Sequence, residues 1–174
     1  MLLAFARMTI RLFYPASHLP HKNHSILASA CIHSLLDEMQ ISIYLTIDQG
    51  DIQFSSPNIY LLGRLPRSSC IQFLHESSAL LFLSSYESLG LPLVEAAEAQ
   101  KPIICLDRPY SRELVGDCPY YYSHNKPEYL AKAIKHFADE SNYPRRAILK
   151  QPKQSIAAAW NLIVSSVDQS NARY

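Results

Sequence analysis

Short runs of apolar residues alternate along the chain with segments of helical spacing, and this alternation constrains the fold more than any other feature of the sequence. The runs that we expect to be strands are 9–14, 41–47, 58–62, 79–83, 102–106 and 120–122. The expected helices are 25–39, 68–77 (capped by Ser68 or Ser69), 91–99, a turn or two over 111–115, 125–138 (capped by Asn125) and 155–167. Almost wholly apolar strands that alternate with helices indicate a parallel sheet covered on both faces. The predicted fold class is therefore α/β, a three-layer, Rossmann-like domain with a parallel sheet.

The length of 174 residues gives room for one domain with its own core. We expect this domain over residues 1–150, followed by a C-terminal helix and tail over 151–174. The polar stretch 141–154, which contains two prolines, would link the two parts. The apolar start, 1–6, is shorter than the about 20 residues that cross a bilayer, and it lacks the cleavage pattern of a signal peptide. We interpret it as a lead-in to the first strand.

Charge, glycine and cysteine content exclude several classes of protein. The 16 basic and 15 acidic residues give a net charge of +1, which argues against a nucleic acid as the main partner. The four glycines cannot form a G-x-G-x-x-G motif or a Walker P-loop. None of the four cysteines forms a C-x-x-C pair, so we expect no disulfide framework and no zinc site. Reduced, buried thiols in a cytoplasmic protein are the favoured interpretation.

Segment 84–96 carries the clearest chemical pattern in the sequence. A buried strand ends there, Glu87 follows, and a helix begins at Leu91 directly after Gly90. The backbone N–H groups at such a helix start lack intrahelical partners and favour an anion. Glu95, one turn inside the helix, gives a second carboxylate that can accept hydrogen bonds from sugar hydroxyls. On this pattern alone, an alternative in which Glu87 caps the helix and Glu95 is merely solvated is about as well favoured.

Residues 87–96, Glu-Ser-Leu-Gly-Leu-Pro-Leu-Val-Glu-Ala, resemble the E-x7-E element of retaining glycosyltransferases of the GT-B fold, in the large group 1 family (family 4). Further segments resemble that family in the same order: 13–24 (its opening strand and lysine loop), 58–63 (the strand and glycine before the nucleobase loop), 101–104 and 110–115. The resemblance covers about residues 10–167. It implies the C-terminal, donor-binding domain, which is half of a GT-B fold.

The resemblance also implies a function and roles for single residues. The domain would take part in transferring a sugar from a nucleotide-sugar to a glycan or lipid-linked acceptor with retention, in surface polysaccharide synthesis. Glu87 would be catalytic, holding the donor sugar for reaction at its anomeric carbon. The expected donor-binding residues are Lys22 for the diphosphate, Glu95 for the ribose, the amides of Ser88, Leu89, Gly90 and Leu91 for the diphosphate or sugar, Gly63, Arg64 and Leu65 for the base, and Ser17 in the loop of Lys22.

The sequence departs from the family in its length and at one charge. The N-terminal acceptor domain is absent from it, so we expect activity only if a separately encoded acceptor domain docks against this chain. Ser17 stands where the family commonly has an arginine, five residues before Lys22. One charge-assisted contact contributes roughly 1.5–3 kcal/mol, so this loss is substantial unless Arg64, His18 or His21 substitutes. The alternative is a truncated, non-catalytic fragment or subunit that binds nucleotide-sugars. Ser88 and Gln100, in place of glycines, are milder changes, and Gln100 predicts a different helix end.

We expect no cofactor and no metal, because one ammonium and a helix start can stabilise a leaving diphosphate. A metal site at His18, His21 and His24 is disfavoured because Pro20 breaks any helix that would align them. The tyrosines at 120–122 are expected to pack in the core rather than stack on a ligand. Basic residues near the linker form either a solvated surface or a peripheral contact with the inner face of the membrane: Arg145, Arg146, Lys150 and Lys153.

Overall fold

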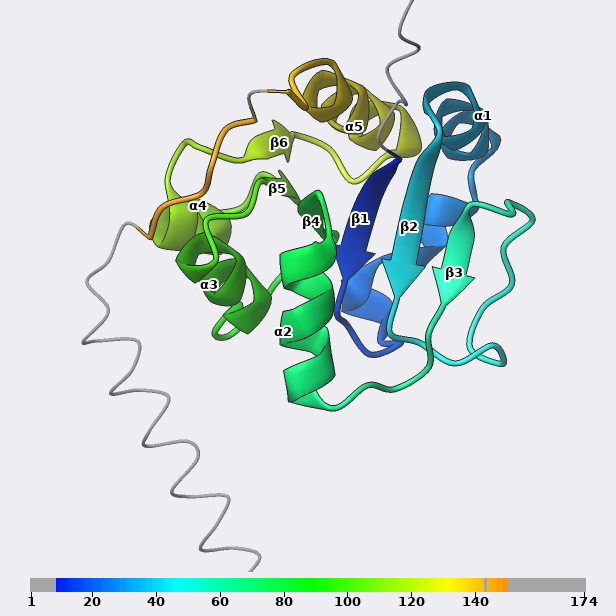
Figure 1. Cartoon of the computed structure of the whole chain (residues 1–174), viewed down its shortest axis with the longest axis horizontal. Helices are drawn as coiled ribbons and strands as arrows, with labels where there is room; N and C mark the ends of the chain where they lie inside the picture. Colours follow the sequence, from blue (N-terminus) through cyan, green and yellow to red (C-terminus); the bar gives the residue numbers. More distant parts are fainter. Residues whose placement is uncertain (1–8, 143, 150–174) are drawn as a thin grey trace, which may run out of the picture.

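The computed structural model describes residues 9–142 and 144–149, which form a six-stranded, wholly parallel sheet (Figure 1). The strand order is β3-β2-β1-β4-β5-β6. The strands are β1 (Ile10–Tyr14), β2 (Ile41–Leu45), β3 (Ile59–Leu61), β4 (Ala79–Phe82), β5 (Ile103–Leu106) and β6 (Tyr120–Tyr122). The helices are α1 (Ala30–Met39), α2 (Arg67–Glu76), α3 (Leu91–Glu98), α4 (Pro109–Val115) and α5 (Pro127–Asp139), with short 3₁₀ helices η1 (Pro20–Lys22) and η2 (His24–Ala28). The predicted α/β, Rossmann-like fold class is confirmed.

The helices cover both faces of the sheet. The chain moves from β1 to β2 in one direction along the sheet, and from β3 through β4 and β5 to β6 in the other. Because crossovers between parallel strands are right-handed, α1 lies on one face, and α2, α3 and α4 lie on the opposite face. Figure 1 shows α1 beside α5 and α3 beside α4, and each pair is in contact. The sheet is thus enclosed between two helical layers.

The sheet has its topological switch point between β1 and β4. From these neighbouring strands the chain leaves in opposite directions, and open parallel sheets commonly bind ligands in a crevice at the carboxyl ends of the strands at such a point. The two loops that follow β1 and β4 contact each other there, since the Ser85 amide donates to the His21 carbonyl over 2.9 Å. The two loops are those in which the sequence analysis places the candidate residues Lys22 and Glu87.

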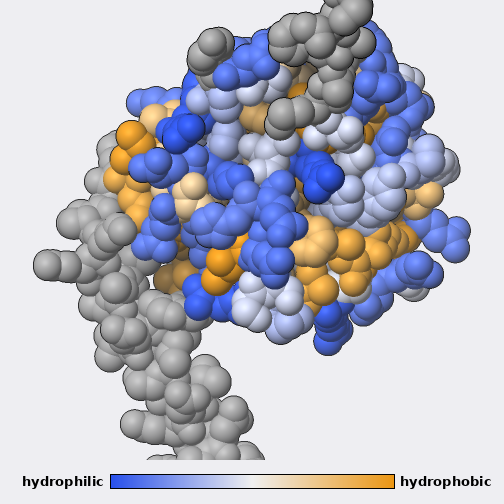
Figure 2. Space-filling view, viewed as in Figure 1, coloured by the Kyte–Doolittle hydropathy of each residue, from blue (hydrophilic) through white to orange (hydrophobic). Residues whose placement is uncertain are grey.

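The core consists of the apolar strand residues and the inner sides of the helices. Every residue of β4 and β5 is buried, as expected for central parallel strands. Tyr120 and Tyr122 are also buried, which confirms that they pack in the core. Figure 2 shows hydrophilic residues over most of the face in view, with smaller hydrophobic areas between them. Among residues 9–142 and 144–149, no helix has the length and apolar character needed to cross a bilayer.

The cysteines are free thiols, but the expectation that they are buried is correct only for Cys105. Cys31 is exposed on α1, and Cys70 and Cys118 are half-buried. Burial raises the pKa of the Cys105 thiol far above its usual range, so this thiol stays protonated.

Four helix starts differ from the predictions, and one of them is that of α4, which begins at Pro109 rather than at Ser111. The segment 25–39 is divided, because Ser29 is extended and separates η2 from α1. Helix α2 begins after Pro66 rather than after Ser68 or Ser69, and α5 begins after Lys126 rather than after Asn125. For α5 the reason is the proline at its first position, whose fixed φ sets the start of a helix. For α2, Pro66 itself is extended, so the helix begins at the next residue. The expected helix over 155–167 and the boundary at 150 lie at or beyond the end of the described residues.

The end of α3 also differs from expectation. Gln100 keeps the usual left-handed geometry, with φ of 51°, although it has a side chain where glycine is the common residue. Its amide donates to the Ala97 carbonyl over 3.0 Å. The helix end is therefore unchanged, and the substitution adds backbone strain instead.

We predict that Gln100→Gly raises the free energy of unfolding by about 1 kcal/mol, because glycine adopts a left-handed conformation without strain. Gln72→Gly is the matched control: Gln72 is an exposed glutamine inside α2, where glycine costs about 1 kcal/mol. Urea denaturation of the three proteins gives both values. A decrease in stability for Gln100→Gly would contradict the strain assigned to this position.

His24 is a buried polar residue that the fold leaves without a hydrogen bond. Its side chain is 2% exposed, and within the described residues neither ring nitrogen has a partner. Its ring lies 5.0 Å from the Tyr14 ring and 5.9 Å from the His18 ring, centroid to centroid. Burial, together with the nearby His18 and Lys22, lowers the pKa of His24 to about 4, although Asp51 opposes this. The folded protein therefore holds His24 neutral at pH 7.

The lowered pKa predicts a pH-dependent stability. The unfolded chain protonates His24 near pH 6.5 and the folded chain only near pH 4, so the unfolded state binds more protons between these values. The contribution of neutral His24 to the free energy of unfolding is fully present above pH 6.5 and is lost as the pH falls toward 4. We expect His24→Phe to lose less stability between pH 7 and pH 5 than the unmodified protein. His75→Gln, at an exposed histidine, should behave like the unmodified protein. Identical pH profiles for His24→Phe and the unmodified protein would refute this account.

Candidate functional site

Lys22 and Glu87, which are 65 residues apart in the sequence, are in contact at the switch point. The Lys22 ammonium donates a hydrogen bond to Glu87 Oε1. The two side chains are 15% and 13% exposed, so the ion pair is largely shielded from water. A shielded pair attracts more strongly than an exposed one. The predicted proximity of the lysine loop and the acidic segment is therefore present in the structure.

The backbone around Lys22 is tied to the sheet by side-chain hydrogen bonds. After η1, Asn23 turns the chain with a left-handed φ of 55°, and its side-chain amide donates to the Leu83 carbonyl over 2.9 Å. The Tyr14 hydroxyl donates to the Lys22 carbonyl over 3.0 Å and also bonds Ser84 Oγ at 2.9 Å. Burial raises the pKa of Tyr14 well above its usual range, so the phenol stays a neutral donor. These bonds fix the direction from which Lys22 enters the crevice.

The start of α3 forms the opposite wall of the site. Gly90 is the N-cap residue, with φ of 56°, and no side chain caps the helix. Within the described part of the chain, the amides of Leu89, Gly90 and Leu91 donate to no group of the protein. The interpretation of Glu87 as a capping residue is thus wrong, because its carboxylate bonds Lys22 instead. Unpaired backbone amides at a helix start can bind an anion by donating hydrogen bonds to it.

Gly90 is required there for steric as well as conformational reasons. A Cβ at this position would lie 2.8 Å from Leu114 Cδ1 of α4, closer than such atoms pack. The Tyr110 hydroxyl of α4 donates to the Ser84 carbonyl over 2.7 Å, which ties the end of β4 to the same helix. Helix α4 therefore supports the loop that carries Glu87.

Glu95 is neither solvated nor unpaired. Arg67, the first residue of α2, donates to Glu95 Oε1 from Nε over 3.0 Å and from Nη2 over 2.8 Å. The glutamate side chain is 19% exposed and the arginine 56%. Sequence reasoning missed Arg67; its only signal is a cation at the first residue of the helix that follows the predicted base loop.

The predicted base loop borders a cavity of about 430 Å³. Gly63 begins this loop with φ of 71°, and its amide donates to the Ile47 carbonyl over 3.1 Å. The residues that line the cavity come from the ends of β1, β2 and β3: Ser17, His18, Leu19, Thr46, Asp51, Arg64 and Leu65. The structure thus brings Ser17, Arg64 and Leu65 together, as predicted for parts of one donor site.

Position 17 is a serine and supplies no positive charge beside Lys22. The residues suggested as substitutes, Arg64, His21 and His18, contact other groups. The Arg64 guanidinium is almost fully exposed and lies 3.7 Å from Asp48. His21 stacks on Tyr86, with ring centroids 4.7 Å apart, and His18 lies 3.7 Å from Asp51. Within residues 9–142 and 144–149 there is no cluster of three histidine, cysteine, aspartate or glutamate side chains that could hold a metal ion.

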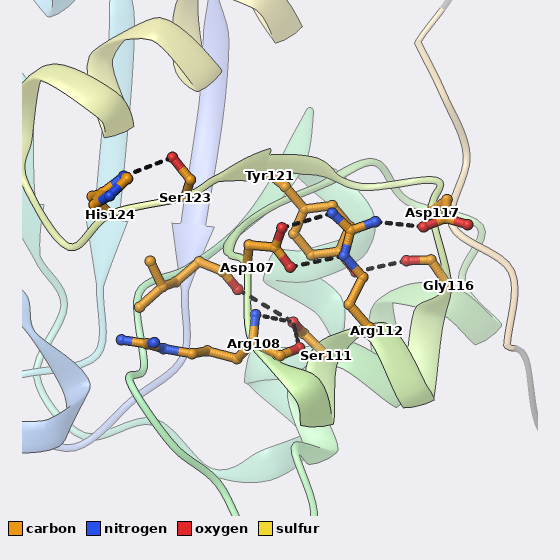
Figure 3. A network of polar contacts seen from close by, with 10 residues as sticks. Asp107, Arg108, Ser111, Arg112, Gly116, Asp117, Tyr121, Ser123 and His124 are labelled. Carbon is orange, nitrogen blue, oxygen red and sulfur yellow. Dashed lines mark hydrogen bonds and ion pairs between the residues drawn. The ribbon is translucent and has the colours of Figure 1, made fainter.

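A second polar network stabilises the loop after β5 (Figure 3). Arg112 donates to both oxygens of Asp107, over 2.8 and 2.7 Å, and also to Asp117. Its guanidinium lies over the Tyr121 ring, 3.9 Å from the centroid. Hydrogen bonds from Arg112 lower the pKa of Asp107, so this carboxylate stays charged at neutral pH. The network holds α4, and α4 in turn packs against Gly90.

Comparison with known sequences gives matches to sugar-transferring proteins. Residues 54–154 match the family described as glycosyl transferases group 1. A serotype-specific mannosyltransferase WbdA of Escherichia coli is 30% identical over 90 residues, which are 50% of this chain and 11% of WbdA. Another WbdA is 36% identical over 72 residues, 40% of this chain and 9% of the relative. The chain thus spans about a tenth of the length of these relatives.

Comparison with solved structures shows the same fold within larger chains. Alr3699/HepE of Anabaena, solved with UDP and glucose, has a TM-score of 0.62 at 18% identity, over 77% of this chain and 40% of HepE. The catalytic domain of starch synthase IV of Arabidopsis thaliana, solved with ADP and acarbose, has a TM-score of 0.64 at 14% identity, over 88% and 34%. These identities establish the fold alone. Because residues 54–154 are more than half of the sequence, the match to their family model shows that this chain belongs to the group 1 glycosyl transferases.

Proposed function

We propose that this domain binds a nucleotide-sugar and is the donor-binding part of a retaining glycosyltransferase of polysaccharide synthesis. The observation that carries the proposal is the contact of Lys22 with Glu87 beside the open amides of α3. The family supports sugar transfer, and the WbdA relatives, which are mannosyltransferases, favour a role in polysaccharide synthesis. HepE, of similar fold, was solved with UDP-glucose, which supports a nucleotide-sugar as the ligand.

Lys22 and the start of α3 would bind the donor diphosphate. A diphosphate would replace Glu87 as the partner of the ammonium and accept from the amides of Leu89, Gly90 and Leu91. Glu87, released from Lys22, would then accept hydrogen bonds from the donor sugar. When the bond to the anomeric carbon breaks, negative charge grows on the leaving diphosphate. The fixed ammonium and amides would stabilise it without reorganisation.

The nucleoside would lie between α3 and the base loop. Glu95 would accept from the ribose hydroxyls, and the base would occupy the cavity lined by Ser17, Arg64 and Leu65. A cavity of about 430 Å³ lies within the usual size range of small-molecule sites. The charge lost at Ser17 would make diphosphate binding weaker than in relatives that carry arginine there.

Sugar transfer would also need an acceptor-binding domain beside this one. Three apolar side chains near the crevice are exposed, and Tyr86 is the most exposed of them at 65%; the others are Leu19 and Leu89. Such apolar surface is typical of a partner interface. A second candidate function, binding of a nucleotide-sugar without turnover, is favoured by Ser17, where a diphosphate-binding charge is missing.

We predict that calorimetric titration with UDP, GDP and ADP detects binding of at least one of them. Glu95→Gln should weaken this binding about tenfold, through loss of a charge-assisted hydrogen bond to the ribose. Lys22→Met should weaken it at least as much. Glu98→Gln is the matched control, because Glu98 is an exposed glutamate on the same helix. Absence of heat with all three nucleotides at millimolar concentration would rule out a functional donor site.

Glu87→Gln is predicted to have a different effect from Glu95→Gln. It removes the partner that competes for the Lys22 ammonium, so affinity for a free nucleoside diphosphate should stay the same or rise. Sugar transfer, measured by release of nucleoside diphosphate from a nucleotide-sugar with an acceptor domain supplied, should fall at least a hundredfold. Equal loss of nucleotide binding in both glutamate variants would contradict the separate roles. Binding without transfer in the unmodified chain would instead favour the second candidate function.

A further inference from the structure

We infer that Arg67 is a positioning residue, which holds Glu95 so that one carboxylate oxygen remains directed to the ribose hydroxyls of the donor. This inference rests on the proposed function, because it assigns a specificity role within the same nucleotide site. It adds a residue from α2 to a site otherwise formed by the loops after β1, β2, β3 and β4 and by α3.

The hydrogen-bond geometry divides the two oxygens of Glu95. Both N–H groups of Arg67 donate to Oε1, over 3.0 and 2.8 Å. Within the described residues, no side chain donates to Oε2. Two guanidinium N–H groups that converge on Oε1 fix the place of this oxygen and occupy it. One oxygen is thus held by the protein, while the other can accept hydrogen bonds from a ligand.

The position of Arg67 in α2 is not explained by the stability of that helix. It is the first helical residue, where the positive end of the helix dipole disfavours a cation. The first turn of α2 contains no acidic residue that would offset this. Glu95 of α3 supplies an anion that contacts this cation.

A second residue in the first two turns of α2, Cys70, also interacts with Glu95. Cys70, one turn after Arg67, is half-buried, and burial together with the charge of Glu95 raises the pKa of its thiol. The Cys70 sulfur donates to the Leu65 carbonyl of the base loop at 3.8 Å. The base loop, Arg67 and Glu95 are therefore connected through one turn of α2. A ligand that contacts Glu95 would also lie near the loop proposed for its base.

Two possible roles of Arg67 predict opposite effects of its removal on nucleotide binding. If Arg67 covered Glu95 and competed with the ligand, removing the guanidinium would strengthen nucleotide binding. If Arg67 orients Glu95, removing it leaves a mobile carboxylate, and the contribution of the ribose hydroxyls falls. The 2′-hydroxyl of the ligand reports on this directly, because a purely structural role of Arg67 would weaken ribose and deoxyribose ligands alike.

The test is calorimetric titration of the full chain with UDP, GDP and ADP and with the 2′-deoxy form of each. We expect the unmodified protein to bind the ribonucleotide about tenfold more tightly than its 2′-deoxy form. Arg67→Ala should bind both forms with nearly equal affinity, and Arg67→Lys, which retains the charge, should recover part of the preference. Arg145→Ala is the matched control, since it removes another exposed arginine–glutamate pair, with Glu140, and should keep the full preference.

The possible outcomes separate the inference from the proposed function. Retention of the full ribose preference in Arg67→Ala, or tighter binding of the ribonucleotide, would overturn the role of Arg67 and leave nucleotide binding intact. No binding of any of the six nucleotides by the unmodified chain would overturn the proposed function and this inference with it. Circular dichroism of each variant verifies that it is folded. If Arg67→Ala fails to fold, the preference measured for Arg67→Lys decides: an unchanged value overturns the inference and a reduced one supports it.

Discussion

The candidate site depends on the contact between the two loops that leave the sheet at its switch point. The Lys22–Glu87 ion pair joins them, and the bonds of Tyr14 to Ser84 and of Asn23 to the Leu83 carbonyl hold them against the sheet. These polar contacts keep the two loops together at the carboxyl ends of the neighbouring strands β1 and β4. A cation, a carboxylate and an open helix start are therefore kept together before any ligand binds. Such preorganisation is what stabilisation of a leaving diphosphate requires.

The strands were predictable because they are short, apolar and buried in the sheet. A run such as Ala79–Phe82 is buried along its whole length, so its apolar character alone identifies it. Helix starts were less predictable, since local backbone geometry decides them. The extended Ser29 interrupts one expected helix, and Pro66 moves the start of another by two or three residues. Gln100 retains a left-handed turn that its residue type disfavours, because the helix and β5 on either side require it.

The proximity of Lys22 and Glu87 was also predictable, because the loops that carry them follow neighbouring parallel strands, β1 and β4, and leave the sheet at the same edge. The partner of Glu95 was not. The pairing with Arg67 depends on how α2 packs against α3, and neither residue belongs to a pattern that joins them in the sequence. His24 shows the same limit: the sequence disfavours a metal site at His18, His21 and His24, but it does not indicate that the His24 ring is buried against Tyr14. Local motifs thus indicated the residues of the candidate site, and tertiary packing determined their contacts.

The proposed function requires the open amides at the start of α3 to bind the phosphates of a nucleotide together with Lys22. The most direct measurement is a ¹H–¹⁵N NMR titration of the isotopically labelled chain with UDP, GDP and ADP. We expect the largest shifts at the amides of Leu89, Gly90 and Leu91, and we expect Lys22→Met to abolish them at the same ligand concentration. Shifts confined to other parts of the domain, with these three amides unchanged at saturation, would contradict the proposed function.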